Sequence, residues 1–114
     1  MSQHMNKTEG SFVIDIESPI IKEASRELNI WWIRGNPMPK VVALLVESFS
    51  AVLEKFPSTD INNPVSVEYD SEVHALYVWY REVNSEKSVV LDTLATTVAD
   101  ISEDGDVAGV EILI

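Results

Sequence analysis

The feature that most constrains the fold is the alternation of apolar and polar residues in the last third of the chain. Apolar residues recur at every second position in Val107–Leu113, and around Ala75–Glu82 the whole run is rich in β-forming residues. A period of two is typical of β-strands, whose successive side chains point to opposite faces of a sheet. Asp104-Gly105 lies just before the last run and is a strong hairpin signal. This part of the chain is therefore predicted to form an antiparallel sheet.

Three more short runs extend the predicted sheet. The first strand has Val65, Val67 and Tyr69 on one face, and Asp70-Ser71-Glu72 turns the chain after it. The remaining strands are predicted over Ala75–Glu82, within Ser88–Asp92, near Val98–Ile101 and over Val107–Leu113.

The first half of the chain carries a helical pattern instead. Between Lys40 and Phe56, apolar residues recur three and four positions apart, and Pro57 ends the run. Ser18-Pro19 is a typical helix start, so a short helix is predicted over Pro19–Leu28. A short strand is predicted before it, around Phe12–Ile16. The stripe on the main helix consists of Val42, Leu45, Val46, Phe49, Val52, Leu53 and Phe56.

These elements predict an α+β fold, in which a small antiparallel sheet packs against one main amphipathic helix and the N-terminal segment adds a strand and a short helix. Residues 1–5, Met-Ser-Gln-His-Met, look like a cloning remnant and are set aside. Residues 6–64 are interpreted as a helical extension that packs on the sheet. The polar, proline-containing stretch Pro57–Pro64 then leads into a β-rich domain over residues 65–114.

The negative charge is concentrated in that β-rich part. Residues 1–64 hold 8 acidic and 6 basic residues, whereas residues 65–114 hold 11 acidic residues and only Arg81 and Lys87 as bases. Such a field repels nucleic acids and anionic membranes and favours a basic protein partner. No basic leader followed by an apolar stretch is visible, and no apolar run is long enough to span a bilayer, so a cytoplasmic protein is expected.

No motif of a catalytic, metal or cofactor site stands out. The chain has no cysteine, and His74 is the only histidine outside the N-terminal remnant. Asp100, Ser102 and Asp104 follow the first positions of a calcium loop, but a strand begins too soon after Gly105. We therefore expect an acidic turn there, a surface position for His74, and no catalytic residue, metal or cofactor.

The second predicted strand is apolar on both of its faces. Leu76, Val78 and Tyr80 point one way, and Ala75, Tyr77, Trp79 and Arg81 point the other way. A strand with one solvated face would be polar on that side, so something should cover both. The cover of the second face could be the N-terminal segment, a binding partner held by Tyr77 and Trp79, or a ligand in a pocket lined by Trp31, Trp32 and Trp79. Gly109 in the last strand indicates a close approach, such as the ring of Tyr77 or Trp79 lying over it.

From Tyr69 to Leu113 the sequence resembles the bacterial and archaeal domain of unknown function 2283 family. The resemblance lies in Tyr69-Asp-Ser-Glu-Val-His-Ala-Leu-Tyr-Val78 and in Asp100–Leu113, which ends in Gly-Val-Glu-Ile-Leu. His74 stands where the family usually has Asp, and Ser102 stands where a second acid is frequent. The segment Pro19–Pro64 has no counterpart in the minimal family domain. The resemblance implies a small antiparallel sheet, assigns no activity, and is compatible with a regulatory or toxin–antitoxin-like setting.

Two functional hypotheses follow. The first is a non-catalytic interaction module that binds a basic partner, in an antitoxin-like or inhibitor-like manner, or forms a homodimer. Its candidate interface residues are Tyr77, Trp79, Arg81, Glu103, Asp104 and Asp106. The alternative is a small-ligand binder or an enzyme, with an aromatic pocket between the N-terminal segment and the sheet.

Overall fold

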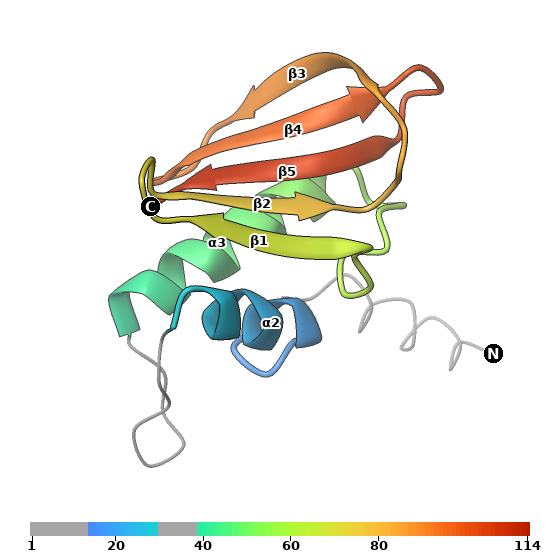
Figure 1. Cartoon of the computed structure of the whole chain (residues 1–114). Coiled ribbons are helices and arrows are strands. Elements are labelled where there is room, and N and C mark those ends of the chain that lie inside the picture. The colour runs from blue at the N-terminus through green and yellow to red at the C-terminus, as the bar shows by residue number, and fades with distance from the viewer. Residues whose placement is uncertain (1–13, 30–38) are drawn as a thin grey trace, which may run out of the picture.

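The computed structural model of the chain describes residues 14–29 and 39–114. Helices α2 (Pro19–Glu27) and α3 (Pro39–Lys55) precede five strands: β1 (Ser66–Asp70), β2 (Ala75–Trp79), β3 (Ser85–Leu91), β4 (Thr96–Ser102) and β5 (Val107–Leu113). The strands form one sheet in the order β1-β2-β5-β4-β3, and every neighbouring pair is antiparallel (Figure 1). The predicted α+β class with an antiparallel sheet is confirmed, with two helices beside it.

Helix α3 supplies the largest apolar surface under the sheet. Val42, Leu45, Phe49 and Val52 lie on its buried face, as the three- and four-residue spacing predicts. On the facing side of the sheet, alternate residues of each strand are buried, and the core joins the two layers. In the central strands this inner face consists of Leu76, Val78, Ala99, Ile101, Val110 and Ile112.

The N-terminus of helix α2 is capped by a residue that lies far away in the sequence. Pro19 occupies the first turn as predicted, but the Ser18 hydroxyl does not cap the helix; it accepts a hydrogen bond from the Asp15 amide at 3.0 Å. The free amide of Ile20 donates instead to Asn62 Oδ1 at 3.1 Å. The capping group therefore comes from the Pro57–Pro64 segment and ties it to the helix.

That segment is part of the core as well. Ile61 is buried, and its carbonyl accepts a hydrogen bond of 2.7 Å from the Tyr80 hydroxyl. Burial, and secondarily the charge of Asp60, raise the pKa of Tyr80, which stays a neutral donor. A polar stretch that looks like a linker is thus bound to both the helical and the β-rich parts.

Replacing Tyr80 with Phe is expected to lower the free energy of unfolding by about 1–2 kcal/mol, because the Ile61 carbonyl loses its donor in a half-buried place. Urea denaturation measures the change. Tyr69→Phe is the matched control, since the Tyr69 hydroxyl lies 3.2 Å from His74 Nδ1 at the surface. If the two substitutions cost the same, the Tyr80 bond does not stabilise the fold.

Of the three covers considered for the second face of the sheet, the N-terminal segment does not take that place in its described residues. Helix α2 lies on the same side as α3, beside β1, and its Ile20 and Ile21 join the core that contains Leu76 and Val78 (Figure 1). Apolar residues of both helices share one core, so they bury one face of the sheet together. The other face receives no cover from residues 14–29 or 39–114.

The predicted strand around Phe12–Ile16 is wrong where it can be compared. Residues 12 and 13 lie outside the described part, and residues 14–18 form a turn in which Ile14 is buried. The Ser18 amide donates to the Asp15 carbonyl at 3.0 Å, a turn bond that no strand would make. Trp31 and Trp32 also lie outside the described residues.

Candidate functional site

The candidate site is the open face of the sheet, which we define as the face opposite α2 and α3. Pairing between the strands arranges its side chains in two rows that cross all five strands. The first row is Ser66, Trp79, Gly109, Asp100 and Ser88, and the second is Glu68, Tyr77, Glu111, Val98 and Val90. Tyr77 and Trp79 are half-buried, whereas Val90 is 72% exposed.

The first row is built around an aromatic ring that covers a glycine. A Cβ atom added to Gly109 would lie 2.6 Å from Cε3 and 2.7 Å from Cζ3 of Trp79, far inside van der Waals contact. The expected aromatic cover of Gly109 is therefore present, and the ring is that of Trp79. Since Gly109 pairs with Asp100 on its other side, the indole lies in the same row as that carboxylate.

Asp100 is a buried acid with one unsatisfied oxygen. Its residue is 4% exposed, and its Oδ1 accepts a hydrogen bond of 2.7 Å from the Ser88 hydroxyl. Its Oδ2 is buried and takes no hydrogen bond from any group in the described part of the chain. A buried carboxylate oxygen without a donor is costly, so this atom requires an explanation.

Glu111 lies diagonally opposite on the neighbouring strand. Its pKa is raised to about 7, first by hydrogen bonding with Asp100, then by burial, and then by the charge of Asp100. Below about pH 7 Glu111 therefore holds a proton, which it can donate to Asp100. Sequence reasoning considered Asp100 only as part of a rejected calcium loop and did not consider Glu111, because the pairing depends on the register of β4 with β5, which shifts at Asp100/Ile101.

The pair makes the stability of the fold depend on pH. The folded-state pKa of Glu111 lies above its ordinary value of 4.5, so its favourable contribution is complete below that value and is lost as pH rises to about 7. Glu111→Gln is expected to remove this loss and to raise the free energy of unfolding at pH 8 by about 1 kcal/mol, a figure reduced for solvent screening. Urea denaturation from pH 5 to 8 measures it. A variant whose stability falls as steeply as the parent's would contradict the raised pKa of Glu111.

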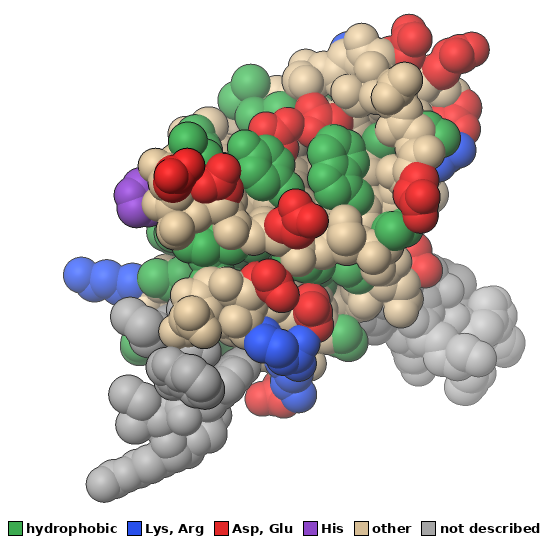
Figure 2. Space-filling view, viewed as in Figure 1, with side chains coloured by type: hydrophobic (Ala, Val, Ile, Leu, Met, Phe, Trp, Pro, Cys, Tyr) green, Lys and Arg blue, Asp and Glu red, His purple; other side chains and the backbone are tan. Residues whose placement is uncertain are grey.

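The charged groups of the open face are all acidic. Glu68 and Asp70 on β1 join Asp100 and Glu111, and neither row contains Lys or Arg. Figure 2 shows hydrophobic and acidic side chains over the strands, with the Lys and Arg side chains at the margins of this face. Apolar rings among uncompensated carboxylates suit a ligand that is both flat and cationic.

The predicted acidic cluster lies at one end of the sheet and is partly neutralised. Arg81 Nη1 donates to both carboxylate oxygens of Asp104 at 2.8 Å and to Asp106 at 3.3 Å. Hydrogen bonds from Ser102 first, and from Arg81 second, lower the pKa of Asp104 to about 2. Glu103 is exposed and has no ion pair with the described residues. The structure therefore brings together Arg81, Asp104 and Asp106, and it leaves Glu103 as the free acid of the turn.

Replacing Arg81 with Gln is expected to raise the pKa of Asp104 from about 2 toward its ordinary 3.8, without reaching it, because the Ser102 hydrogen bond remains. Since a lowered pKa stabilises the fold above the ordinary value, the parent should lose this contribution only as pH falls toward 2. Carboxyl NMR titration measures the midpoint. Lys87→Gln removes the same charge without touching the turn and should leave it in place. An unchanged midpoint in Arg81→Gln would show that the ion pair does not form.

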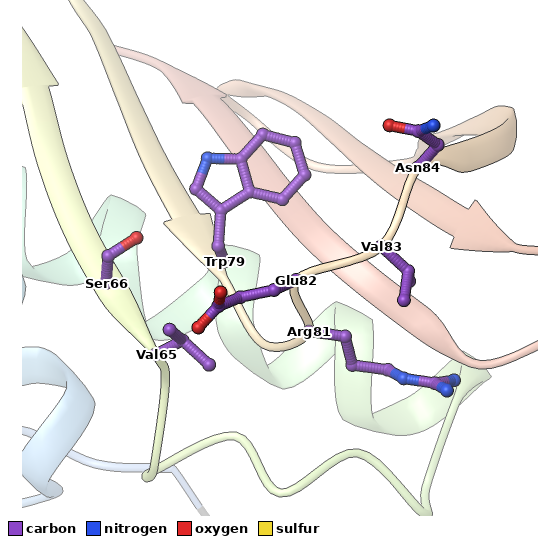
Figure 3. A pocket seen from close by; sticks show the side chains of 7 residues that line it. All are labelled: Val65, Ser66, Trp79, Arg81, Glu82, Val83 and Asn84. Atoms are coloured by element: carbon purple, nitrogen blue, oxygen red, sulfur yellow. The ribbon is translucent and has the colours of Figure 1, made fainter.

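A shallow groove of about 620 Å³ borders Trp79 at the end of β2 (Figure 3). Its lining residues are Val65, Ser66, Trp79, Arg81, Glu82, Val83 and Asn84. Figure 3 shows the Trp79 ring standing beside it and the Arg81 side chain pointing away from that ring. The predicted pocket of Trp31, Trp32 and Trp79 stays a prediction, since the first two lie outside the described residues.

His74 occupies the turn between β1 and β2. It is exposed and adopts a left-handed backbone conformation with φ of 55°. Within residues 14–29 and 39–114, no group of three or more His, Cys, Asp or Glu side chains is arranged to hold a metal ion. No helix in that part of the chain is long and apolar enough to cross a membrane.

Residues 66–113 match the family described as "Protein of unknown function (DUF2283)". The resemblance inferred from Tyr69–Leu113 is confirmed, and the match begins with β1 and ends with β5. Comparison with curated proteins gives no match, and comparison with solved structures gives none. The matched region therefore is the five-stranded sheet, including its whole open face, while α2 and α3 lie outside it.

Proposed function

We propose that this protein is a non-catalytic interaction module whose open face binds a basic protein partner. The observation that carries this proposal is the combination of Tyr77 and Trp79 with four carboxylates and no base on a face that the described residues leave uncovered. Tyrosine and tryptophan are favoured anchors of protein interfaces. Opposite charge accelerates encounter and discriminates against wrong partners.

The apolar content of this face also supports binding. A solvated sheet face normally carries polar side chains, yet this one carries Val98, Val90 and Leu113 beside the two rings, with Leu113 48% exposed. Contiguous exposed apolar surface rimmed by polar groups is typical of interaction sites. The cover that the N-terminal helix does not provide would then come from the partner.

A basic partner fits better than a second copy of the chain. Two open faces stacked on each other would bring Glu68, Asp70, Asp100 and Glu111 of both copies together, with no base between them. Juxtaposed like charges disfavour such a contact. A small acidic protein that neutralises a basic one, in the manner of an inhibitor or antitoxin, is the sharpest form of the proposal.

Affinity capture with two charge-reversed variants tests the proposal. The double variant Glu68→Lys/Asp70→Lys alters exposed positions of the open face, and Glu27→Lys/Glu54→Lys makes the same charge change on the helices. The parent and the helix variant should retain a basic protein that is released at high salt, and the open-face variant should lose it. Equal capture by both variants, an acidic partner, or none in a lysate of the source cells would count against this function.

The groove beside Trp79 supports a second candidate, the binding of a small molecule. Its volume and its aromatic wall suit a small ligand, although it is widely open. Tryptophan fluorescence against a metabolite panel tests it, with Trp79→Phe as the variant that should lose the response. A response that survives in Trp79→Phe would place the ligand elsewhere.

A further inference from the structure

We propose that Asp100 and Glu111 form an anchor site for an arginine side chain of the partner, with the Trp79 indole beside it. This inference rests on the proposed function and specifies its recognition chemistry.

Asp100 has one carboxylate oxygen that could accept a hydrogen bond from a bound arginine. Ser88 occupies Oδ1 at 2.7 Å, so Oδ2 is the oxygen left for Glu111, and no N–H or hydroxyl of the described residues reaches it. The residue is 96% buried, since its exposed fraction is 4%. A buried acceptor in this state needs either a proton on its neighbour or a donor from another molecule.

None of the described groups that face Glu111 is a base that could neutralise it. Its register partners are Tyr77 on β2 and Val98 on β4, with Glu68 beyond Tyr77 on β1. On β3 the rows end in Ser88 and Val90, and the helices pack on the other face. Among the two bases of residues 65–114, Arg81 is committed to Asp104, and Lys87 pairs with Ile101 outside these rows.

The shape of the site favours a guanidinium over an ammonium group. A guanidinium is planar, carries several donors in a fixed fork and is weakly hydrated, so it bridges carboxylates and stacks on aromatic rings. Trp79 covers Gly109, the residue between itself and Asp100 in the row, and its ring therefore forms the wall next to the pair. An ammonium group lacks the plane that would use this wall.

Binding of a guanidinium to the pair is coupled to the release of a proton. Below about pH 7 the free protein holds a proton on Glu111, whose pKa is raised to about 7. Binding of the guanidinium requires an ionised Glu111, so below pH 7 its proton leaves to solvent and no bond other than the O–H bond breaks. Affinity should therefore fall about tenfold for each pH unit below 7 and level off above it.

The test uses the full chain and two small probes, acetyl-arginine amide and its neutral isostere acetyl-citrulline amide. Amide NMR spectra at pH 7.5 should show saturable shifts at Gly109 and Glu111 with the arginine probe, and none with citrulline. Glu111→Gln should lose the binding at least tenfold while keeping its folded spectrum, because the amide mimics the protonated acid. Glu68→Gln removes the same charge from the same row and should weaken binding no more than about twofold.

Three results would overturn the inference: equal shifts with citrulline, equal losses in Glu68→Gln and Glu111→Gln, or an affinity that does not change between pH 5.5 and 7.5. Titrations at pH 6 in two buffers with different heats of ionisation count the released proton, and a value near zero would also overturn it. These outcomes are separable from failure of the proposed function. A basic partner that is captured equally by the parent and by Glu111→Gln keeps the function and rejects the anchor.

Discussion

Replacing Phe49 with Ala is expected to lower the free energy of unfolding by about 3–5 kcal/mol, the largest effect of any single substitution considered for this chain. Phe49 is fully buried at 0% exposure and lies at the centre of the face that α3 presents to the sheet. Its removal takes away the transfer free energy of the ring and leaves a cavity between two layers. Neither layer can close that cavity without moving away from its other contacts.

Urea denaturation followed by circular dichroism measures the loss. Leu44→Ala on the same helix is the control, since Leu44 is only half-buried and does not belong to the buried core cluster, and it should cost less than about 1 kcal/mol. If Phe49→Ala is as stable as Leu44→Ala, helix α3 does not hold the sheet as the structure describes. A marginally stable domain of this size could unfold altogether, and a folded fraction recovered in a stabilising osmolyte would then quantify the same loss.

Replacing Gly109 with Val is expected to destabilise the fold by about 1–3 kcal/mol, the cost typical of overpacking. Valine is a better strand former than glycine, so propensity alone would predict a gain. The added Cβ would meet the Trp79 ring at 2.6 Å and the Val78 carbonyl oxygen at 3.1 Å, and the ring must leave its place. The emission spectrum of Trp79 should shift as the indole moves toward water.

The double variant Gly109→Val/Trp79→Ala separates the two effects. Without the ring, the valine should cost less than about 0.5 kcal/mol relative to Trp79→Ala alone, because only the contact with Val78 remains. Calorimetry or urea denaturation of the four proteins completes the cycle. An equal cost of Gly109→Val in both backgrounds would show that the ring does not rest on the glycine.

Sequence patterns predicted the elements well where burial is one-sided. Helix α3 was expected from Lys40 to Phe56 and spans Pro39–Lys55, and β5 has the expected bounds Val107–Leu113. In both elements a single apolar face packs on one core, so the period of the side chains reports the geometry directly. The strand β2 was harder to interpret, because it is apolar on both faces, and period alone cannot say which layer covers each side.

The candidate site depends on relationships that no local pattern contains. The Asp100–Glu111 pair arises from the register of two strands and its shift at Asp100/Ile101. The Asn62 cap of α2 joins residues 42 positions apart. Arg81 was assigned to the outward face of β2, but the strand ends at Trp79, and the Arg81 side chain turns to Asp104. Only the Trp79–Gly109 contact could be anticipated, since a glycine inside a strand marks a close approach.

The match over residues 66–113 begins after α3 ends, so the matched region does not include the helices that cover its apolar face. A chain reduced to the matched strands would expose Leu76, Val78, Val110 and Ile112 to water, residues that α2 and α3 now cover. Such a chain would need another apolar layer over this face, from either a neighbouring domain or another polypeptide. Here α2 and α3 provide that layer from the N-terminal side of the sheet, and residues 14–29 and 39–114 leave the acidic face uncovered.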